Sequence, residues 1–168
     1  WWYHMKFADK EFSYYWQAIQ WPTSILIVWS IAGLIVGLTA FDSYISIFGN
    51  RWLGFAPYLF FLIAGYLAAS DHGATVKQSS WAGALSAAVS GLVGMIVFFI
   101  MLSASPLLEW TIQTAVSQSA AAGAAADPAM LEKVLPVTMS IGAVFGVVIN
   151  AALGGLLGWI GFLLSKKL

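Results

Sequence analysis

The stretch VTMSIGAVFGVVINAALGGLLGWIGFLL, residues 137–164, contains no charged side chain and decides the fold class. A helix needs about 20 mostly apolar residues to cross a hydrocarbon core of about 30 Å, because each residue advances about 1.5 Å. Three further stretches, at about residues 22–41, 52–70 and 81–102, meet this requirement. Lipid offers the backbone no hydrogen bonds, so such spans must be helices. We therefore predict an all-α membrane protein, a four-transmembrane-helix bundle.

The composition agrees with this fold class. Of 168 residues, 61% are hydrophobic and 8% are charged, which is far more apolar than a typical soluble domain. Seven Lys and Arg balance seven Asp and Glu, so no net positive field attracts nucleic acid. The chain has no cysteine, which excludes disulfides and thiolate metal sites. The predicted surroundings are membrane lipids, and nucleic acid is not expected as a partner.

The charged residues lie outside the four spans and predict an orientation. The two connections on one side carry Arg51 and Lys133. The side shared by the N-terminus, the second loop and the C-terminus carries Lys6, Lys10, Lys77, Lys166 and Lys167. Cytoplasmic loops are enriched in Lys and Arg, so both termini are expected in the cytoplasm.

Residues 1–21 have the pattern of an amphipathic interfacial helix. Apolar side chains recur at helical spacing from Met5 to Ile19, opposite a polar face. Aromatic rings favour the headgroup layer, and Pro22 permits a bend into the first span. The expected anchors are Trp1, Trp2, Phe12, Trp16 and Trp21. Docking of this helix against another subunit is the alternative.

The third loop, residues 103–136, is predicted to be external and helical. Ser105 followed by Pro106 is a typical helix start, and Asp127 followed by Pro128 is a second one. The alanine-rich segment between them is interrupted by Gly123. We expect two short helices joined by a spacer.

Small residues mark faces on which helices can pack. In lipid, helix association depends on close packing and interhelical hydrogen bonds, so small residues four apart favour contact. The fourth span repeats them at strict four-residue spacing, and shorter series occur in the first and third spans. We expect these three spans to share close contacts. The packing residues are Gly33 and Gly37 in the first span, Ser86, Ser90 and Gly94 in the third, and Gly142, Gly146, Asn150, Gly154 and Gly158 in the fourth.

Asn150 is the single strongly polar side chain deep in a predicted span. Its amide needs partners, and an interhelical hydrogen bond is worth about 0.6 kcal/mol and at most about 2. The alternative is a ligand contact in a cavity, or a pigment-associated site. The side chains considered as partners are Ser30, Tyr66, Ser86 and Ser90.

Residues that carry chemistry are missing from the spans. Proton-coupled transporters keep an ionisable residue inside the membrane, and none of the four spans has one. The two histidines, His4 and His72, lie outside the spans, so paired haem ligation is not expected. No nucleophile, metal or phosphate-binding motif is found. We expect no catalytic site, no metal site and no cofactor, and leave open a lipid, or a pigment from neighbouring subunits.

One segment resembles a known group of proteins. PYLFFLIAGYLAAS from Pro57, a short polar loop, and WAGALSAAVSGLVG up to Gly94 resemble the Gly/Ala-rich helical hairpin of small uncharacterised prokaryotic four-helix membrane proteins. The resemblance covers under a quarter of the chain and implies four spans in a prokaryotic cytoplasmic (inner) membrane. It supplies no binding residues. The matching residues are Gly65, Tyr66, Leu67, Gly83, Ala84 and Leu85.

Two functional hypotheses follow. The chain has packing faces but no intramembrane charge, which favours a non-catalytic accessory or structural subunit of a larger integral membrane complex. The alternative is a small channel or transporter for ions, water or small solutes, acting as a homo-oligomer. If the chain is a structural subunit, the series of small residues and Asn150 should face other helices. If it forms a pore, they should face water.

Overall fold

The computed structural model describes residues 5–50 and 53–167. Two short strands, β1 (Lys6–Phe7) and β2 (Lys10–Glu11), form an antiparallel hairpin. The helices are α1 (Phe12–Thr39), α2 (Phe41–Phe48), α3 (Ala56–His72), α4 (Val76–Ala104), α5 (Leu107–Ala121) and α6 (Pro128–Ser165), with a 3-10 turn η2 (Leu53–Phe55) before α3. Apart from the hairpin, the regular structure of the described chain is helical.

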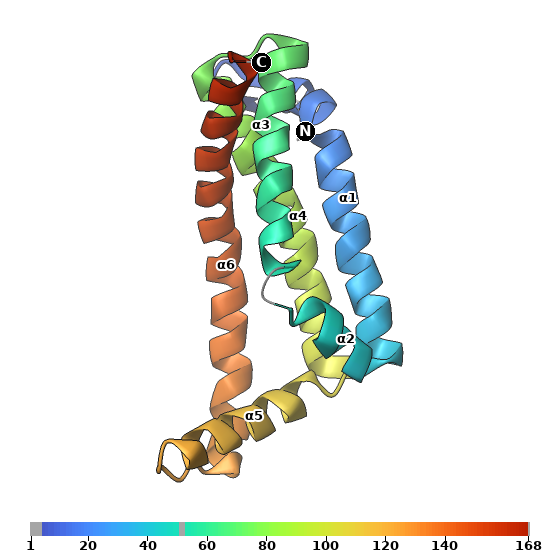
Figure 1. The fold of residues 1–168 in the computed structure, drawn as a ribbon, viewed down its shortest axis with the longest axis vertical. Helices are drawn as coiled ribbons and strands as arrows, with labels where there is room; N and C mark the ends of the chain where they lie inside the picture. Colours follow the sequence, from blue (N-terminus) through green and yellow to red (C-terminus); the bar gives the residue numbers. More distant parts are fainter. Residues whose placement is uncertain (1–4, 51–52, 168) are drawn as a thin grey trace.

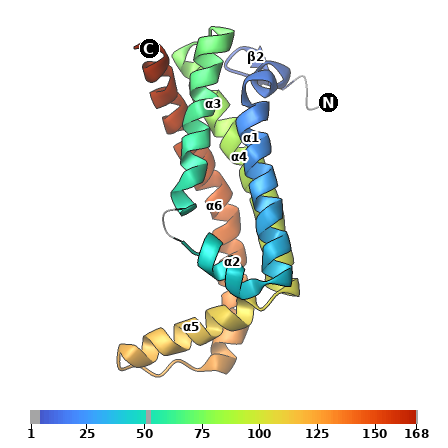
Figure 2. The same cartoon turned by 45° about the vertical axis from the view of Figure 1, so that its right-hand side comes forward.

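The four long helices α1, α3, α4 and α6 run side by side in alternating directions (Figure 1). The hairpin, the α3–α4 turn and the C-terminal end of α6 gather at one end, called here the terminal end. At the opposite end α5 runs roughly perpendicular to the long helices and extends beyond them to one side (Figure 2). The helix α3 is the shortest of the four, and its first residues lie part-way along the bundle rather than at its far end.

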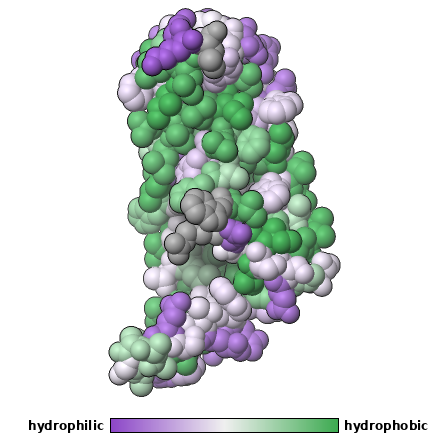
Figure 3. Space-filling view, in the orientation of Figure 1, coloured by the Kyte–Doolittle hydropathy of each residue, from purple (hydrophilic) through white to green (hydrophobic). Residues whose placement is uncertain are grey.

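Four helices are long and apolar enough to cross a membrane: α1, α3 with its preceding 3-10 turn, α4 and α6. Their most apolar windows have mean hydropathies between 1.6 and 2.4. The space-filling view shows hydrophobic residues along the helical body and hydrophilic ones gathered near its two ends (Figure 3). The prediction of an all-α chain with four such segments is confirmed.

Two prolines lie inside helices that continue past them. Pro22 is within α1 and Pro136 within α6. Proline removes a backbone donor, so the surroundings must offset that loss. The Pro22 ring is fully buried, and its packing against the neighbouring helices offsets the loss at that position. The first and fourth spans are therefore longer than the apolar stretches alone predict.

The prediction of a separate helix over residues 1–21 is wrong for residues 5–11, which form the hairpin. Ala8 and Asp9 both have positive φ, 47° and 68°, the conformation that a tight two-residue hairpin turn requires. The Phe7 ring packs 5.1 Å from the Trp81 ring, and the Phe7 carbonyl accepts a hydrogen bond from the Tyr15 hydroxyl. These contacts with α1 and α4 select the hairpin over a surface helix.

The apolar face expected in the headgroup layer lies largely inside the bundle. Tyr15 and Ile19 are 0% exposed and pack against alanines of α3 and α4. Phe12 and Trp16 are half-buried and stack on each other, whereas Trp21 is 61% exposed. Trp1 and Trp2 lie outside the described residues, and the anchoring role of the five aromatic side chains stays a prediction.

The third loop contains one short helix and not two. Ser105 Oγ accepts a hydrogen bond from the Leu107 backbone, and α5 ends just before Gly123, whose φ is +75°. Asp127 Oδ1 caps the next helix through the Ala129 N–H at 2.9 Å, as its sequence predicts. That helix is α6 itself, because its 38 residues continue without a break into the fourth span.

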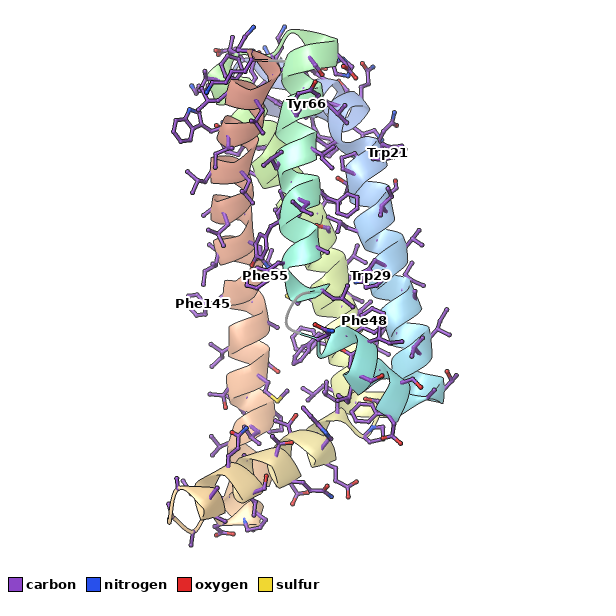
Figure 4. All side chains as sticks on the ribbon, viewed as in Figure 1. Trp21, Trp29, Phe48, Phe55, Tyr66 and Phe145 are labelled. Carbon is purple, nitrogen blue, oxygen red and sulfur yellow. The ribbon has the colours of Figure 1, made fainter. Side chains whose placement is uncertain are left out.

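The helix α2 was not predicted. It follows α1 directly and packs back against the C-terminal half of α1. The Phe48 ring lies 4.9 Å from the Trp29 ring, and Figure 4 shows the two side chains next to each other. Tyr44 stacks on the same Phe48 at 5.2 Å. Burial raises the pKa of the Tyr44 hydroxyl above its ordinary value, because the apolar surroundings disfavour the charged phenolate.

Candidate functional site

The closest helix approach joins α4 and α6 through Gly83, Gly154 and Gly158. A Cβ atom added at Gly154 would lie 2.5 Å from the Gly83 carbonyl oxygen and 2.6 Å from the Cβ of Ala87. A Cβ added at Gly83 would lie 2.9 Å from the Gly158 backbone. No side chain fits between these backbones, so only glycine permits this crossing.

The same part of α6 also meets α3. A Cβ at Gly65 would lie 2.7 Å from the Gly158 carbonyl carbon, and one at Gly161 would lie 2.6 Å from the Tyr66 nitrogen. Gly158 therefore lies between two other helices, with Gly65 on one side and Gly83 on the other. We call Gly65, Gly83, Gly154, Gly158 and Gly161 the glycine junction.

The five-residue series of the fourth span is divided by the structure. Gly154 and Gly158 belong to the junction, whereas a Cβ at Gly142 or Gly146 would have no atom within 4 Å. Four residues of α-helix turn by about 400°, so each step of a strict four-residue repeat shifts the face by about 40°. From Gly142 to Gly158 the direction of the small residues around the helix axis therefore changes by about 160°, and a single neighbouring helix cannot contact all five positions.

Sequence reasoning missed Gly65, Gly83 and Gly161 as packing residues. Gly154, Gly158 and Gly161 follow the spacing of four and three that tracks one helix face, which is the signal that identifies them. Gly94 of α4, in contrast, was predicted to pack, and a Cβ there would have no atom within 4 Å.

Gly33 and Gly37 make room for side chains and not for another spanning backbone. A Cβ at Gly33 would lie 3.1 Å from the Phe48 ring of α2. A Cβ at Gly37 would collide with the Met101 side chain of α4, which is 1% exposed. The first span therefore packs against α4, as predicted, but its glycines accept α2 and a methionine. In the described part of the chain α1 shares no close face with α6, so the expected contact between the first and fourth spans is wrong.

Ser86 and Ser90 lie in the interface between α1 and α4. Ser86 Oγ and Thr23 Oγ1 are 2.9 Å apart in a buried hydrogen bond, and both side chains are 0% exposed. Ser90 donates to the Ser86 carbonyl oxygen at 2.7 Å, within its own helix. Thr23 was not among the predicted partners, and its pair with Ser86 fixes the register of the two helices.

Asn150 is bound by a residue that the sequence did not suggest. Its Oδ1 accepts a long hydrogen bond of 3.3 Å from the Tyr58 hydroxyl of α3. Ser86 and Ser90 have the partners given above, and Ser30 donates to the Leu26 carbonyl oxygen at 2.9 Å. The prediction of an interhelical bond is confirmed, with a different partner.

Asn150 lines two neighbouring cavities. One, of about 160 Å³, lies among α1, α3, α4 and α6, where Ser30, Ser90 and Asn150 supply its polar atoms. The other, of about 320 Å³, is a groove between the diverging halves of α4 and α6. We call this second cavity the open groove; its lining includes Gly91, Gly94, Met95, Phe98, Met139, Ala143, Gly146 and Asn150.

The described residues contain no group of three or more His, Cys, Asp or Glu side chains placed to hold a metal ion. No family model, curated protein or solved structure matches the chain. The resemblance to small prokaryotic four-helix membrane proteins therefore stays a prediction.

Replacing Gly158 with alanine tests the glycine junction. The added methyl group meets backbone atoms of α4 that cannot move aside, so we expect a loss of about 1–3 kcal/mol in unfolding free energy. Gly142→Ala is the matched control, since a Cβ there meets open space and alanine is the better helix former. Reversible unfolding in mixed micelles measures both, and equal stabilities would contradict the junction.

Replacing Tyr58 with phenylalanine tests the Asn150 bond. Removing the hydroxyl should lower the unfolding free energy by about 0.6 kcal/mol, and by no more than about 2. Tyr66→Phe makes the same chemical change at a hydroxyl with no hydrogen bond among the described residues, and should change little. A loss of the same size in both variants would show that the bond to Asn150 is not its cause.

Proposed function

We propose that this chain is an integral protein of a prokaryotic cytoplasmic membrane and a non-catalytic structural subunit of a larger membrane assembly. The observation that carries the proposal is the open groove. On the small-residue face of α6, Gly154 and Gly158 pack against other helices of the chain, whereas a Cβ at Gly142 or Gly146 would meet no atom within 4 Å. A surface suited to close helix contact is thus left without a helix.

Membrane insertion is supported by what the four long helices expose. Large apolar side chains of α6 point outward, with Phe145 62% and Val148 64% exposed. Figure 4 shows Phe145 directed away from the neighbouring helices. In water such a surface would be a severe liability, whereas hydrocarbon tolerates it. The 38 residues of α6 span about 57 Å, so its first turns project beyond a core of about 30 Å.

The proposed orientation places the terminal end in the cytoplasm. Five lysines lie there, on the hairpin, at the start of α4 and at the end of α6, against the carboxylates of Asp9, Glu11 and Asp71. The connections on the other side carry Arg51 by sequence and, among the described residues, Lys133 near the start of α6, together with the carboxylates of Asp42, Glu109, Asp127 and Glu132. This asymmetry supports cytoplasmic termini under the positive-inside rule.

The open groove has the chemistry of a helix-packing site. At Gly94 on α4 and Gly146 on α6 an added Cβ would meet no atom within 4 Å, so these two positions leave room for an approaching backbone. A helix laid there gains close backbone contact, which is the main source of association between helices in lipid. The Asn150 side chain in its wall offers amide donors to such a helix. The proposed occupant is a membrane-spanning helix of another subunit.

The channel hypothesis has less support. Its polar candidates pair with each other within the chain, Thr23 with Ser86 and Tyr58 with Asn150, instead of lining a continuous path. A homo-oligomeric pore would need further polar groups on outer faces, where α6 presents Val144, Phe145 and Val148. Transport of ions, water or small solutes by purified protein in liposomes, above empty vesicles, would favour the channel.

Gly146→Leu tests the structural-subunit proposal. Its side chain fills the open groove without touching the glycine junction, so the chain should fold while companions are lost. Overpacking of about 1–3 kcal/mol weakens association by about five- to 160-fold, so the companion protein recovered after mild-detergent extraction and identified by mass should fall at least about fivefold. Val148→Leu, on the lipid-facing side, should retain the companions.

Two results would contradict the proposal. One is extraction of wild-type protein as this chain alone, whether as a monomer or as a homo-oligomer. The other is equal recovery of companions with Gly146→Leu and Val148→Leu.

A further inference from the structure

A second groove lies on the α4–α6 seam near the terminal end. It measures about 420 Å³ and is open along its length. Its floor is made of small side chains from both helices, Ser80 and Ala84 on α4 and Ala151, Ala152 and Gly155 on α6. It shares no lining residue with the open groove, so the two surfaces are independent. We call it the seam groove.

Lys77 and Trp81 give one end of the seam groove a different chemistry. Lys77 is the second residue of α4, which begins at the terminal end of the bundle, and is exposed. It has no carboxylate partner within residues 5–50 and 53–167. Trp81, one turn further along, also lines the groove, and indole rings favour the membrane interface.

We propose that the seam groove binds one anionic phospholipid of the leaflet at the terminal end. The phosphate pairs with the Lys77 ammonium, and an acyl chain lies over Ala84 and Ala152. Ala84 is seven residues beyond Lys77, about 10 Å deeper along the helix, which is the direction an acyl chain takes from its headgroup.

Charge complementarity favours a lipid over a protein helix as the occupant. An apolar helix packed in the seam groove would cover part of the Lys77 side chain and would bring no counter-charge for its ammonium. An anionic headgroup supplies the counter-charge at the surface and apolar chains below it. Juxtamembrane Lys and Arg attract anionic lipids by about 1 kcal/mol each.

Native mass spectrometry of the detergent-purified chain, titrated with phosphatidylglycerol or phosphatidylcholine, tests this site. Wild type should bind phosphatidylglycerol more tightly than phosphatidylcholine. Lys77→Gln should weaken phosphatidylglycerol binding about fivefold, which corresponds to about 1 kcal/mol, and Lys77→Arg should retain it. Lys133→Gln, which removes an exposed cation at the opposite end, is the matched control and should bind as wild type.

Ala152→Leu examines the acyl-chain part of the groove. Because Ala152 is exposed and lines the floor, leucine fills the groove without entering the core, and binding of both lipids should fall. Equal wild-type affinity for the two lipids, or equal binding by Lys77→Gln and Lys133→Gln, would overturn the proposal. Cross-linking of two copies through Ala152→Cys would also overturn it, by showing that a second chain covers the groove.

Discussion

The rest of the structure depends on backbone contact among three helices at the glycine junction. In lipid, burying one apolar surface against another yields little, so helices associate where their backbones approach closely. Gly158 meets Gly65 of α3 and Gly83 of α4, and this fixes three of the four long helices relative to one another. The first helix is then held on α3 and α4 by alanines and by the Thr23–Ser86 hydrogen bond.

The position of the glycine junction determines where grooves remain between α4 and α6. Because α4 and α6 cross near the terminal end, they diverge toward α5, and the divergence leaves the open groove between Gly94 and Gly146. On the outer side of the same crossing, small residues leave the seam groove below Lys77. One packing constraint thus accounts for both surfaces, one suited to a helix and the other to a lipid.

Much of this fold could be predicted from the sequence, because hydrophobic length alone identifies the four helices that are long and apolar enough to cross a membrane. The start of α6 at Asp127 and Pro128 followed from local capping chemistry. The N-terminal hairpin could not be predicted, since long-range contacts of Phe7 with Trp81 decide it. For the candidate site, residue type identified Asn150, but its partner Tyr58 depends on the depth at which α3 begins.

Cysteine cross-linking between α4 and α6 in native membranes tests the central claim most directly, because the chain has no cysteine of its own. The Ala84 Cβ lies 3.6 Å from the Cβ position of Gly155, within the range of about 3.5–4.5 Å that a disulfide needs. Cysteines at these two positions should form an intramolecular disulfide on mild oxidation. Cysteines replacing Gly94 and Gly155 should not, because Gly94 lies ten residues, about 15 Å, along α4 from Ala84. Failure of the first pair to link, or linkage only between two chains, would contradict the account.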